Sequence, residues 1–448
     1  MFTTKGIITK QFISVIILLH AIFFIIAVWI RGIYTLDSPE YLLTAENLIN
    51  NCTFYNGTMD GTLNPTLYTL RPPGYPVFIA LCKLIVNSDI TIILLQNILS
   101  IILCIYLYKE SRKISDSMSS GIMITSGLIM FPVYLILVNM VMAESLLAVL
   151  LLSALILIKR YLENHKWHYL LLFNFVLALS VLTKPVMMYF WIPNLLFSIY
   201  LLWKYRQIYI LTFSLILPLV IGLWSYRNYK TTGFFEYSSI KTQNLLELNA
   251  GSIISFLENH DEMKQHREAI LLSSKSYSEY GERSAYLMNE AKSVIYEHPV
   301  LYMYLHLKGM VNFLLAPGRI DIEIFFNIRQ KNDISLLYEI EKRGFNNGLT
   351  YYAKNVNSPL IITTFFIFCW NIVLMLFLFF SFFSKKLTME QKAAIFMLVF
   401  YIVFASGPGG YARFKVALFP VFLYMLPYGV DVIKNFRNYK IPLLQNKS

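Results

Sequence analysis

"QFISVIILLHAIFFIIAVWIRGIYTLDSPE" occupies residues 11–40 and joins a long apolar run to a polar segment that carries two carboxylates. Residues 11–30 contain no Lys, Arg, Asp or Glu, and the run is long enough for a helix to cross the hydrocarbon core of a bilayer. It is too long for a removable signal peptide and lacks a small-residue cleavage site, so we predict a retained transmembrane helix. Asp37 and Glu40 then lie where that helix leaves the membrane.

Similar apolar runs recur along the whole chain. Of its 448 residues, 57% are hydrophobic and 14% are charged, and the mean hydropathy is +0.56. These values predict an all-α polytopic membrane protein, because a helix satisfies its own backbone hydrogen bonds inside lipid. We predict ten transmembrane helices, at residues 11–30, 90–108, 119–138, 141–158, 167–183, 185–203, 208–226, 359–383, 391–406 and 415–433.

The distribution of basic residues predicts the orientation. Every second connection in the ten-helix arrangement is short and basic, and these six pieces together hold 17 Lys/Arg against 4 Asp/Glu, while the whole chain has a net charge of +12. The six pieces are residues 1–10, 109–118, 159–166, 204–207, 384–392 and 434–448. Short basic connections stay in the cytoplasm, so we expect both termini there. No basic stripe with an aromatic platform accompanies the charge, so we expect no nucleic-acid partner.

Two long connections fall on the opposite, outer face, at residues 31–89 and 227–358. We therefore divide the chain into an N-terminal transmembrane core (1–226), which includes the first outer connection, an outer region (227–358), and C-terminal transmembrane helices with a short cytoplasmic tail (359–448). Within the outer connections, the apolar runs in 69–86 and 298–316 are expected to form re-entrant or interfacial helices.

The segment around Asp37 allows two interpretations. Ser38 as N-cap with Pro39 at the first helical position leaves the carboxylate of Asp37 uncommitted. Alternatively, Asp37 and Glu40 form a capping box and serve only the helix. In both cases an amphipathic helix at the interface follows, and it holds the carboxylate at the membrane surface.

Four basic residues are expected at outer helix ends: Arg71, Lys184, Arg227 and Arg413. Arg71 precedes the stiff "PPGYP" turn, and its alternative role is to reach lipid head groups. Arg413 follows "SGPGGYA", whose backbone N–H groups suit a phosphate, although the same sequence suits a flexible hairpin. Lys184 precedes Pro185 at a tight turn. Arg227 suits a phosphate site, but it could equally be a residue that only marks the end of its transmembrane helix.

Glu144 lies near the outer end of an apolar helix, where an ionisable residue is a functional hypothesis by default. Its alternative is a structural role through hydrogen bonds, for example to Asn139. Glu40 is expected to orient Asp37 or to share a divalent cation, Mg or Mn, with it. The histidines show no zinc-ligand spacing, and no Gly-rich nucleotide loop is present.

Together, these residues resemble the polytopic GT-C glycosyltransferases, in particular the bacterial relatives of the protein O-mannosyltransferases and of the lipid A aminoarabinose transferases. The resemblance rests on "LDSPEYLLTAENL" after the first span, "RPPGYPVFIAL", and Glu144 in "VMAESLLAVLLLSAL". It continues with "WSYRNYKTTGFFEYSS" and the terminal "ARFKVALFPVFLYML". The family usually has a proline where this chain has Ala417.

The resemblance implies a hexosyl- or pentosyltransferase of the plasma membrane. It implies transfer of a sugar from a polyprenyl-phosphate carrier to an envelope lipid, glycan or protein on the outer face. Asp37 matches the catalytic aspartate, and Glu40 and Glu144 are further catalytic candidates. The candidates for binding the donor phosphate, in order, are Arg413, Arg71, Arg227 and Lys184. GT-C enzymes occur with and without a metal. The alternatives are an envelope polysaccharide polymerase or ligase, and a lipid flippase or transporter.

Overall fold

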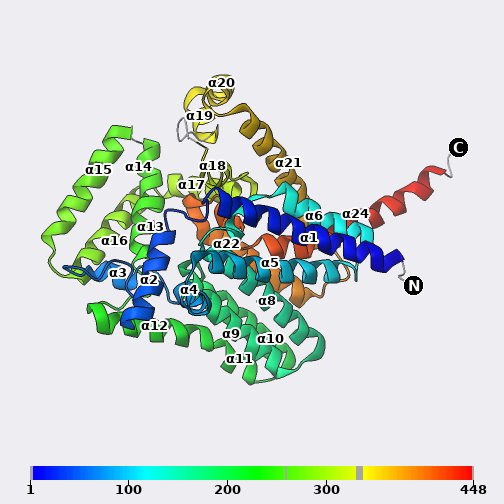
Figure 1. The fold of residues 1–448 in the computed structure, drawn as a ribbon, viewed down its shortest axis with the longest axis horizontal. Coiled ribbons are helices and arrows are strands. Elements are labelled where there is room, and N and C mark those ends of the chain that lie inside the picture. Colours follow the sequence, from blue (N-terminus) through cyan, green and yellow to red (C-terminus); the bar gives the residue numbers. More distant parts are fainter. Residues whose placement is uncertain (1–3, 258–259, 329–335, 446–448) are drawn as a thin grey trace.

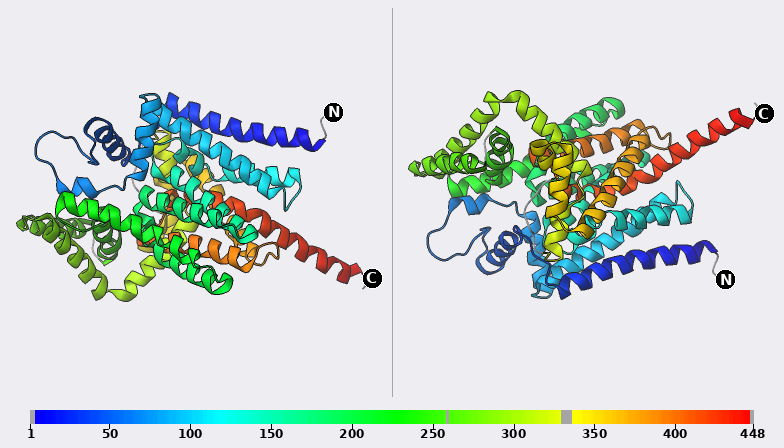
Figure 2. Two further views of the ribbon diagram at one scale, coloured as in Figure 1. Left: turned by 90° about the horizontal axis from the view of Figure 1, so that it is seen from below. Right: turned by 90° about the horizontal axis from the view of Figure 1, so that it is seen from above.

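The protein is all-helical. The computed structural model describes residues 4–257, 260–328 and 336–445, and within these ranges it contains no strand. The helices form a bundle in which both termini lie at one end, while α2 (Ser38–Asn51), α3 (Pro65–Thr69) and the helices α14 to α16 lie at the other (Figures 1 and 2). We call the second end the loop end. The all-α membrane fold predicted from the sequence is confirmed.

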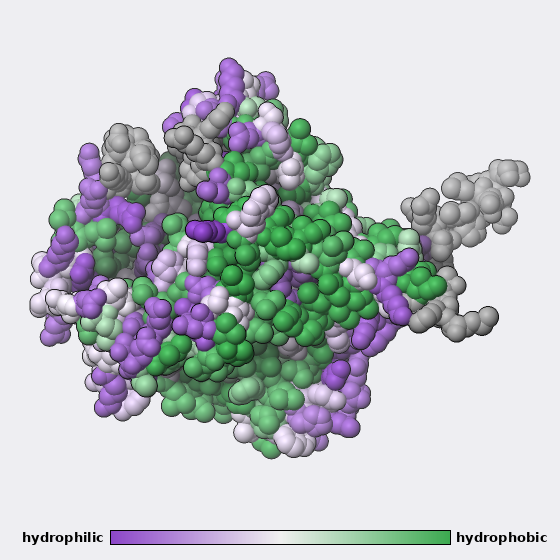
Figure 3. Space-filling model, in the orientation of Figure 1, coloured by the Kyte–Doolittle hydropathy of each residue, from purple (hydrophilic) through white to green (hydrophobic). Residues whose placement is uncertain are grey.

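Seven helices within the described residues are long and apolar enough to cross a membrane. They cover Ile7–Trp29, Asp89–Ser111, Ala143–Asn164, Pro185–Tyr205, Tyr209–Thr232, Ser358–Ser381 and Met389–Gly409. Figure 3 shows a broad apolar surface over the middle of the bundle and hydrophilic residues over the helices of the loop end. An apolar belt with a polar end is the surface expected of a membrane protein.

Each of the ten predicted spans coincides with helical structure. The corresponding helices are α1 (Thr4–Trp29), α5 (Asp89–Ser111), α6 (Ser117–Met130) with α7 (Val133–Val138), α8 (Ala143–Asn164), α9 (Trp167–Thr183), α10 (Trp191–Tyr205), α11 (Tyr209–Ser214) with α12 (Ile216–Thr232), α21 (Ser358–Ser381), α22 (Met389–Ser406) and α24 (Phe419–Gln445). The spans predicted at 119–138, 167–183 and 415–433 are not among the seven long apolar helices.

Local breaks account for the differences from uniform spans. Pro132 interrupts the predicted helix 119–138, because proline lacks the N–H group and clashes with the preceding turn. The span predicted at 185–203 begins as a 3-10 helix, Pro185–Phe190. The span predicted at 208–226 is divided at Leu215 and continues to Thr232.

α24 is the central helix of the bundle. Its residues from Phe419 to Gly429 are buried, and the helix packs against α5, α6, α8 and α21. A methyl group on Gly429 would lie only 2.0 Å from the backbone oxygen of Phe377 on α21. The absence of a side chain at Gly429 therefore permits the close crossing of α21 and α24, as small residues do in other membrane helices.

The two long connections are themselves helical. The first contains α2, α3 and α4 (Gly74–Ile85), and α4 is the short apolar helix expected within 69–86. The second contains α13 (Ile240–Asn244), a π-helical turn (Leu245–Ala250), α14 (Gly251–Leu257), α15 (His260–Ser273), a 3-10 turn (Ser274–Ser276), α16 (Tyr280–Glu297), α17 (Pro299–Leu315), α18 (Arg319–Phe325), α19 (Leu336–Arg343) and α20 (Phe345–Asn355). α17 is the helix predicted at 298–316.

Candidate active site

Asp37 lies at the N-terminus of α2, and its carboxylate does not cap that helix. The backbone of Asp37 occupies the N-cap position, but its side chain makes no capping hydrogen bond. Ser38, which the sequence suggested as the N-cap, is the first helical residue. Its hydroxyl accepts a hydrogen bond from the Thr35 N–H (2.8 Å) and donates to the Val141 carbonyl (3.0 Å). The capping-box interpretation of Asp37 is therefore wrong, and the carboxylate is available for other partners.

Arg71 meets both carboxylates of the first connection. Its side chain donates to Glu40 at 2.7 Å and lies 3.2 Å from Asp37. The guanidinium also lies over the ring of Tyr41, 5.0 Å from its centre, and Tyr41 is buried. Because Tyr41 and Glu40 are on α2, the contacts join the turn before α4 to the first turn of α2.

Arg413 reaches the same carboxylate from the C-terminal part of the chain. Its Nη2 donates to Asp37, and its Nε donates to Oε1 of Glu144 at 2.6 Å. It lies on α23 (Ala412–Lys415), just after the 3-10 turn Gly407–Gly409. A methyl group on Gly309 of α17 would lie 2.0 Å from the Gly407 carbonyl oxygen, so the glycine-rich turn packs tightly against α17. The turn is therefore packed against α17 and leads directly into α23, which carries Arg413.

Glu144 connects two cations. Its side chain has 0% exposure, and its Oε1 accepts from Nε of Arg413 and from Nζ of Lys184, the latter at 2.7 Å. Its Oε2 has no hydrogen-bond partner within the described part of the chain. The alternative of a partner at Asn139 is wrong, because the Asn139 amide donates to the Leu135 carbonyl and its oxygen accepts from Asn97.

Six of the seven predicted site residues thus meet in one charge cluster at the loop end. We define the charge cluster as Asp37, Glu40, Arg71, Glu144, Lys184 and Arg413. It joins the first connection, the starts of α4 and α8, the α9–α10 turn and α23. Three carboxylates and three cations bring its formal charge to zero. Glu40 and Asp37, with side chains 34% and 24% exposed, are its most accessible carboxylates.

The charges of the cluster stabilise one another. Burial alone would raise the pKa of Asp37, but Arg413 and Arg71 outweigh burial and hold that pKa below its ordinary value. Burial opposes the charge of Arg413 as well, and the nearby Glu144 carboxylate is the largest influence that keeps its pKa above the ordinary value. Lys184 differs, because burial lowers its pKa in spite of Glu144. Asp37 and Arg413 are therefore fully ionised near neutral pH.

Arg227 lies outside the charge cluster. Its guanidinium donates to the backbone carbonyls of Tyr68 (2.8 Å) and Phe54 (3.1 Å), and it lies over the rings of Trp224 and Phe54. These contacts attach the first long connection to α12. Its role as a phosphate ligand remains a prediction, while its observed partners are backbone carbonyls, the side-chain oxygen of Asn228 (3.1 Å) and aromatic rings.

Two buried ionisable residues near the cluster do not stand out in the sequence. Lys415 follows Arg413 by two positions, is fully buried, and donates to the carbonyls of Leu314 and Ala316. Asp321, on α18, is also buried. The sequence signal for Asp321 is one of two acids that alternate with isoleucines in "GRIDIEIF", shortly after the pair Pro317-Gly318.

The residues present do not fit the divalent cation that the sequence left open. The side chain of Arg71 contacts both Asp37 and Glu40, so a guanidinium already serves as the shared cation of these two carboxylates. Within the described ranges, no group of three or more His, Cys, Asp or Glu side chains is arranged to hold a metal ion. We therefore derive no step through a metal.

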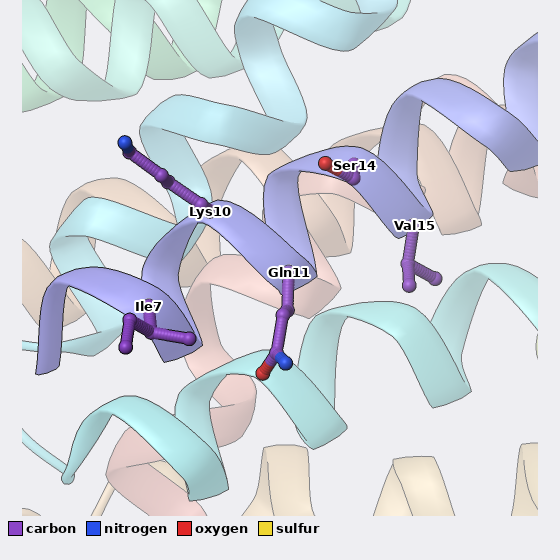
Figure 4. A pocket seen from close by; sticks show the side chains of 5 residues that line it. All are labelled: Ile7, Lys10, Gln11, Ser14 and Val15. Carbon is purple, nitrogen blue, oxygen red and sulfur yellow. The ribbon is translucent and has the colours of Figure 1, made fainter. Parts of the chain in front are cut away.

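Two grooves on the surface lie away from the charge cluster. One, of about 450 Å³, is lined by Ile7, Lys10, Gln11, Ser14 and Val15, all from α1 (Figure 4). The other, of about 550 Å³, lies where α16 meets α17, from Glu297 to Tyr304. The first is confined to one face of a single helix, so it is a weak candidate for a reaction site. The converging charges, rather than these grooves, identify the candidate site.

Part of the chain is similar to a known protein family. Residues 70–226 match the family model described as dolichyl-phosphate-mannose-protein mannosyltransferase. This segment carries three members of the charge cluster, namely Arg71, Glu144 and Lys184. The match covers about a third of the chain and supports the resemblance noted in the sequence over that segment. No curated protein matched the chain significantly.

Solved structures of an oligosaccharyltransferase from Archaeoglobus fulgidus are similar at 13% sequence identity. The apo form gives a TM-score of 0.48 over 98% of this chain and 52% of that one. A complex with Zn and sulfate gives 0.45 over 95% and 50%. A third, the archaeal oligosaccharyltransferase AglB with an inhibitory peptide and a dolichol-phosphate, gives 0.42 over 98% and 52%. The chain spans about half the length of these proteins.

Proposed function

We propose that the protein is a membrane glycosyltransferase that moves a sugar from a polyprenyl-phosphate carrier to an acceptor at the loop end of the bundle. The observation that carries the proposal is the position of Arg413, whose guanidinium contacts both Asp37 and Glu144. A proton acceptor and a phosphate-binding cation are therefore adjacent. The match to a family named for a dolichyl-phosphate-linked sugar supports a donor of the same chemical type.

In the proposed reaction Asp37 is the general base. The acceptor hydroxyl attacks C1 of the sugar, its proton passes to the carboxylate of Asp37, and the bond between C1 and the phosphate oxygen breaks. The electron pair of that bond stays on the polyprenyl phosphate, whose growing charge is stabilised by Arg413 and Arg71. Attack from the side opposite the phosphate inverts the configuration at C1.

Binding of the donor also activates the base. Asp37 is paired with both guanidiniums in the free protein, and this pairing makes it a weak base. A donor phosphate that takes over hydrogen bonds from Arg413 and Arg71 releases the carboxylate and raises its proton affinity. The base thus becomes effective only when a phosphate is present.

The other cluster residues hold the cations in place. Glu40 binds Arg71, and Glu144 binds Arg413 and Lys184. We therefore assign Glu40 and Glu144 to positioning, and Lys184 to the supply of further positive charge near the phosphate.

We further propose that the loop end is the outer face of the plasma membrane. Both termini lie at the opposite end of the bundle (Figure 2), which agrees with the basic excess of the short connections and a cytoplasmic position of both termini. The acceptor is then an envelope lipid, a glycan or an exported protein, and the second connection, 227–358, is the part of the chain available to select it.

The test is complementation of a deletion strain, with mass spectrometry of envelope lipids, glycans and exported proteins. Wild type restores the missing glycosylated product, whereas Asp37→Asn reduces its formation at least about 100-fold, the lower range for loss of a general base. Asp60→Asn is the matched control, because Asp60 is an exposed carboxylate of the same connection. Full activity of inserted Asp37→Asn would overturn the proposal and favour a flippase or a polymerase with another base.

A further inference from the structure

Asp321 is a buried acid with an unused oxygen beside the charge cluster. The residue is 6% exposed, and its Oδ2 has no hydrogen-bond partner in the described ranges of the chain. An ionised carboxylate in such a position would be strongly unfavourable. The observation calls for an explanation, since buried polar groups are normally hydrogen-bonded.

The fold places this carboxyl group next to the segment that carries Arg413. A methyl group built on Gly318, at the start of α18, would lie 3.4 Å from Oδ2 of Asp321 and 3.1 Å from Cβ of Ala412. Gly318 has a positive φ of 80°, a conformation that glycine adopts without strain. α18 then packs against α7, and Gly318 itself lies close to Ala412 of α23.

The titratable surroundings of Asp321 come from several elements. Arg413 of α23 and Glu144 of α8 act on it electrostatically, and Asp321 acts on Tyr411. On α18 itself, Arg319 and Glu323 form an ion pair of 2.9 Å. α7, which packs against α18, contributes Tyr134, whose hydroxyl bonds to Ser100. Lys415 of α23 is engaged by backbone carbonyls.

The protonation state of Asp321 determines the net charge of the site. The charge cluster is neutral in the free protein, and a phosphodiester donor adds one negative charge. A neutral Asp321 leaves that balance unchanged, whereas an ionised Asp321 would place another negative charge beside Arg413 before the donor arrives. Like charges in a desolvated site repel strongly.

We propose that Asp321 is a protonation-dependent positioning residue, and that an anionic phosphodiester binds to Arg413 and Arg71 only while Asp321 carries a proton. The inference rests on the proposed function, since it assumes that the charge cluster binds the donor phosphate. Burial raises the pKa of Asp321 to about 7, in spite of the nearby Arg413. Binding of the donor therefore weakens above neutral pH, and there it is accompanied by uptake of up to one proton from the buffer.

The experiment measures binding of a polyprenyl methyl phosphate to the full chain in nanodiscs from pH 6 to pH 8.5. This probe is a diester, so its own single charge does not change over that range, and it cannot undergo sugar transfer. If only the protonated form binds, apparent Kd rises about 30-fold between the two pH values for a group that titrates near 7. Proton uptake on binding is measured at pH 8.5 by calorimetry in buffers of different ionisation enthalpy.

Asp321→Asn separates this effect from other titrations. The variant is expected to bind the probe with nearly the same Kd at both pH values, whereas the control Asp60→Asn keeps the wild-type dependence. Lys184, whose pKa is lowered by burial, is present in all three proteins, so an alkaline loss that survives in Asp321→Asn belongs to Lys184 and overturns the inference. The wild-type measurement stands even where Asp321→Asn is unstable.

Different results would refute the proposed phosphate site and the proposed role of Asp321. No binding of the probe at any pH overturns the proposed phosphate site and this inference with it. Binding with an unchanged Kd from pH 6 to pH 8.5, and without proton uptake, overturns the role of Asp321 alone.

Discussion

Removal of the Glu144 carboxylate tests whether the charge cluster is a coupled unit. Glu144 is fully buried and accepts from two cations, Arg413 and Lys184, at 2.6 and 2.7 Å. Loss of one partner from a buried ion pair costs about 3–5 kcal/mol, because the other charge is left buried without compensation. We therefore expect Glu144→Ala to lower the free energy of unfolding by this amount, and to weaken donor binding because Arg413 loses one of its supports.

The assay is reversible unfolding by SDS in mixed micelles, followed by tryptophan fluorescence. Glu46→Ala is the control, since its carboxylate is 56% exposed and lies 3.9 Å from Lys83, and such surface pairs contribute about 0–1 kcal/mol. Lys184→Met in the Glu144→Ala background removes one uncompensated cation, so the two changes together are expected to cost at least about 1 kcal/mol less than their sum. A Glu144→Ala loss no larger than that of Glu46→Ala, or simple additivity with Lys184→Met, would refute the coupling.

Two further substitutions separate the cations by role. Arg413→Lys keeps the charge but cannot donate to Asp37 and Glu144 with separate nitrogens of a planar group. Initial-rate measurements should show the KM for the donor rising at least about tenfold, which corresponds to the loss of one charge-assisted hydrogen bond. An unchanged KM would contradict the role assigned to Arg413. Arg227→Met removes the hydrogen bonds to the carbonyls of Phe54 and Tyr68. We therefore expect faster proteolysis within residues 52–65 and an unchanged KM for the donor. A rise in this KM equal to that of Arg413→Lys would instead place Arg227 at the phosphate.

The architecture was largely predictable because lipid imposes a simple rule on sequence. Uninterrupted apolar runs such as 11–30 and 359–383 can only be helices in a bilayer, and the structure has α1 and α21 there. The local breaks were harder to predict. A hydrophobic run such as 119–138 does not reveal whether Pro132 bends a helix or ends it. The result depends on whether neighbouring helices supply hydrogen-bond partners for the backbone groups that the proline leaves unpaired.

The composition of the candidate site was only partly predictable. Arg413 and Asp37 are 376 residues apart in the chain, and their meeting was anticipated from the order of motifs in a family, not from residue spacing. The position of Arg227 at a helix end did not reveal that loop carbonyls would engage it. Asp321 escaped notice because an acid in a short helix after Pro-Gly normally faces water, and only the packing of α18 against α7 shows that it is buried.

In the proposed mechanism, one site holds the phosphate of a lipid carrier beside the base Asp37. The most direct test is a cryo-EM structure of the full chain in nanodiscs with polyprenyl phosphate bound. We expect phosphate oxygens within about 3 Å of the guanidiniums of Arg413 and Arg71, with the carboxylate of Asp37 released from at least one of them. A phosphate bound elsewhere, with the pairs from Asp37 to Arg413 and Arg71 intact, would contradict it.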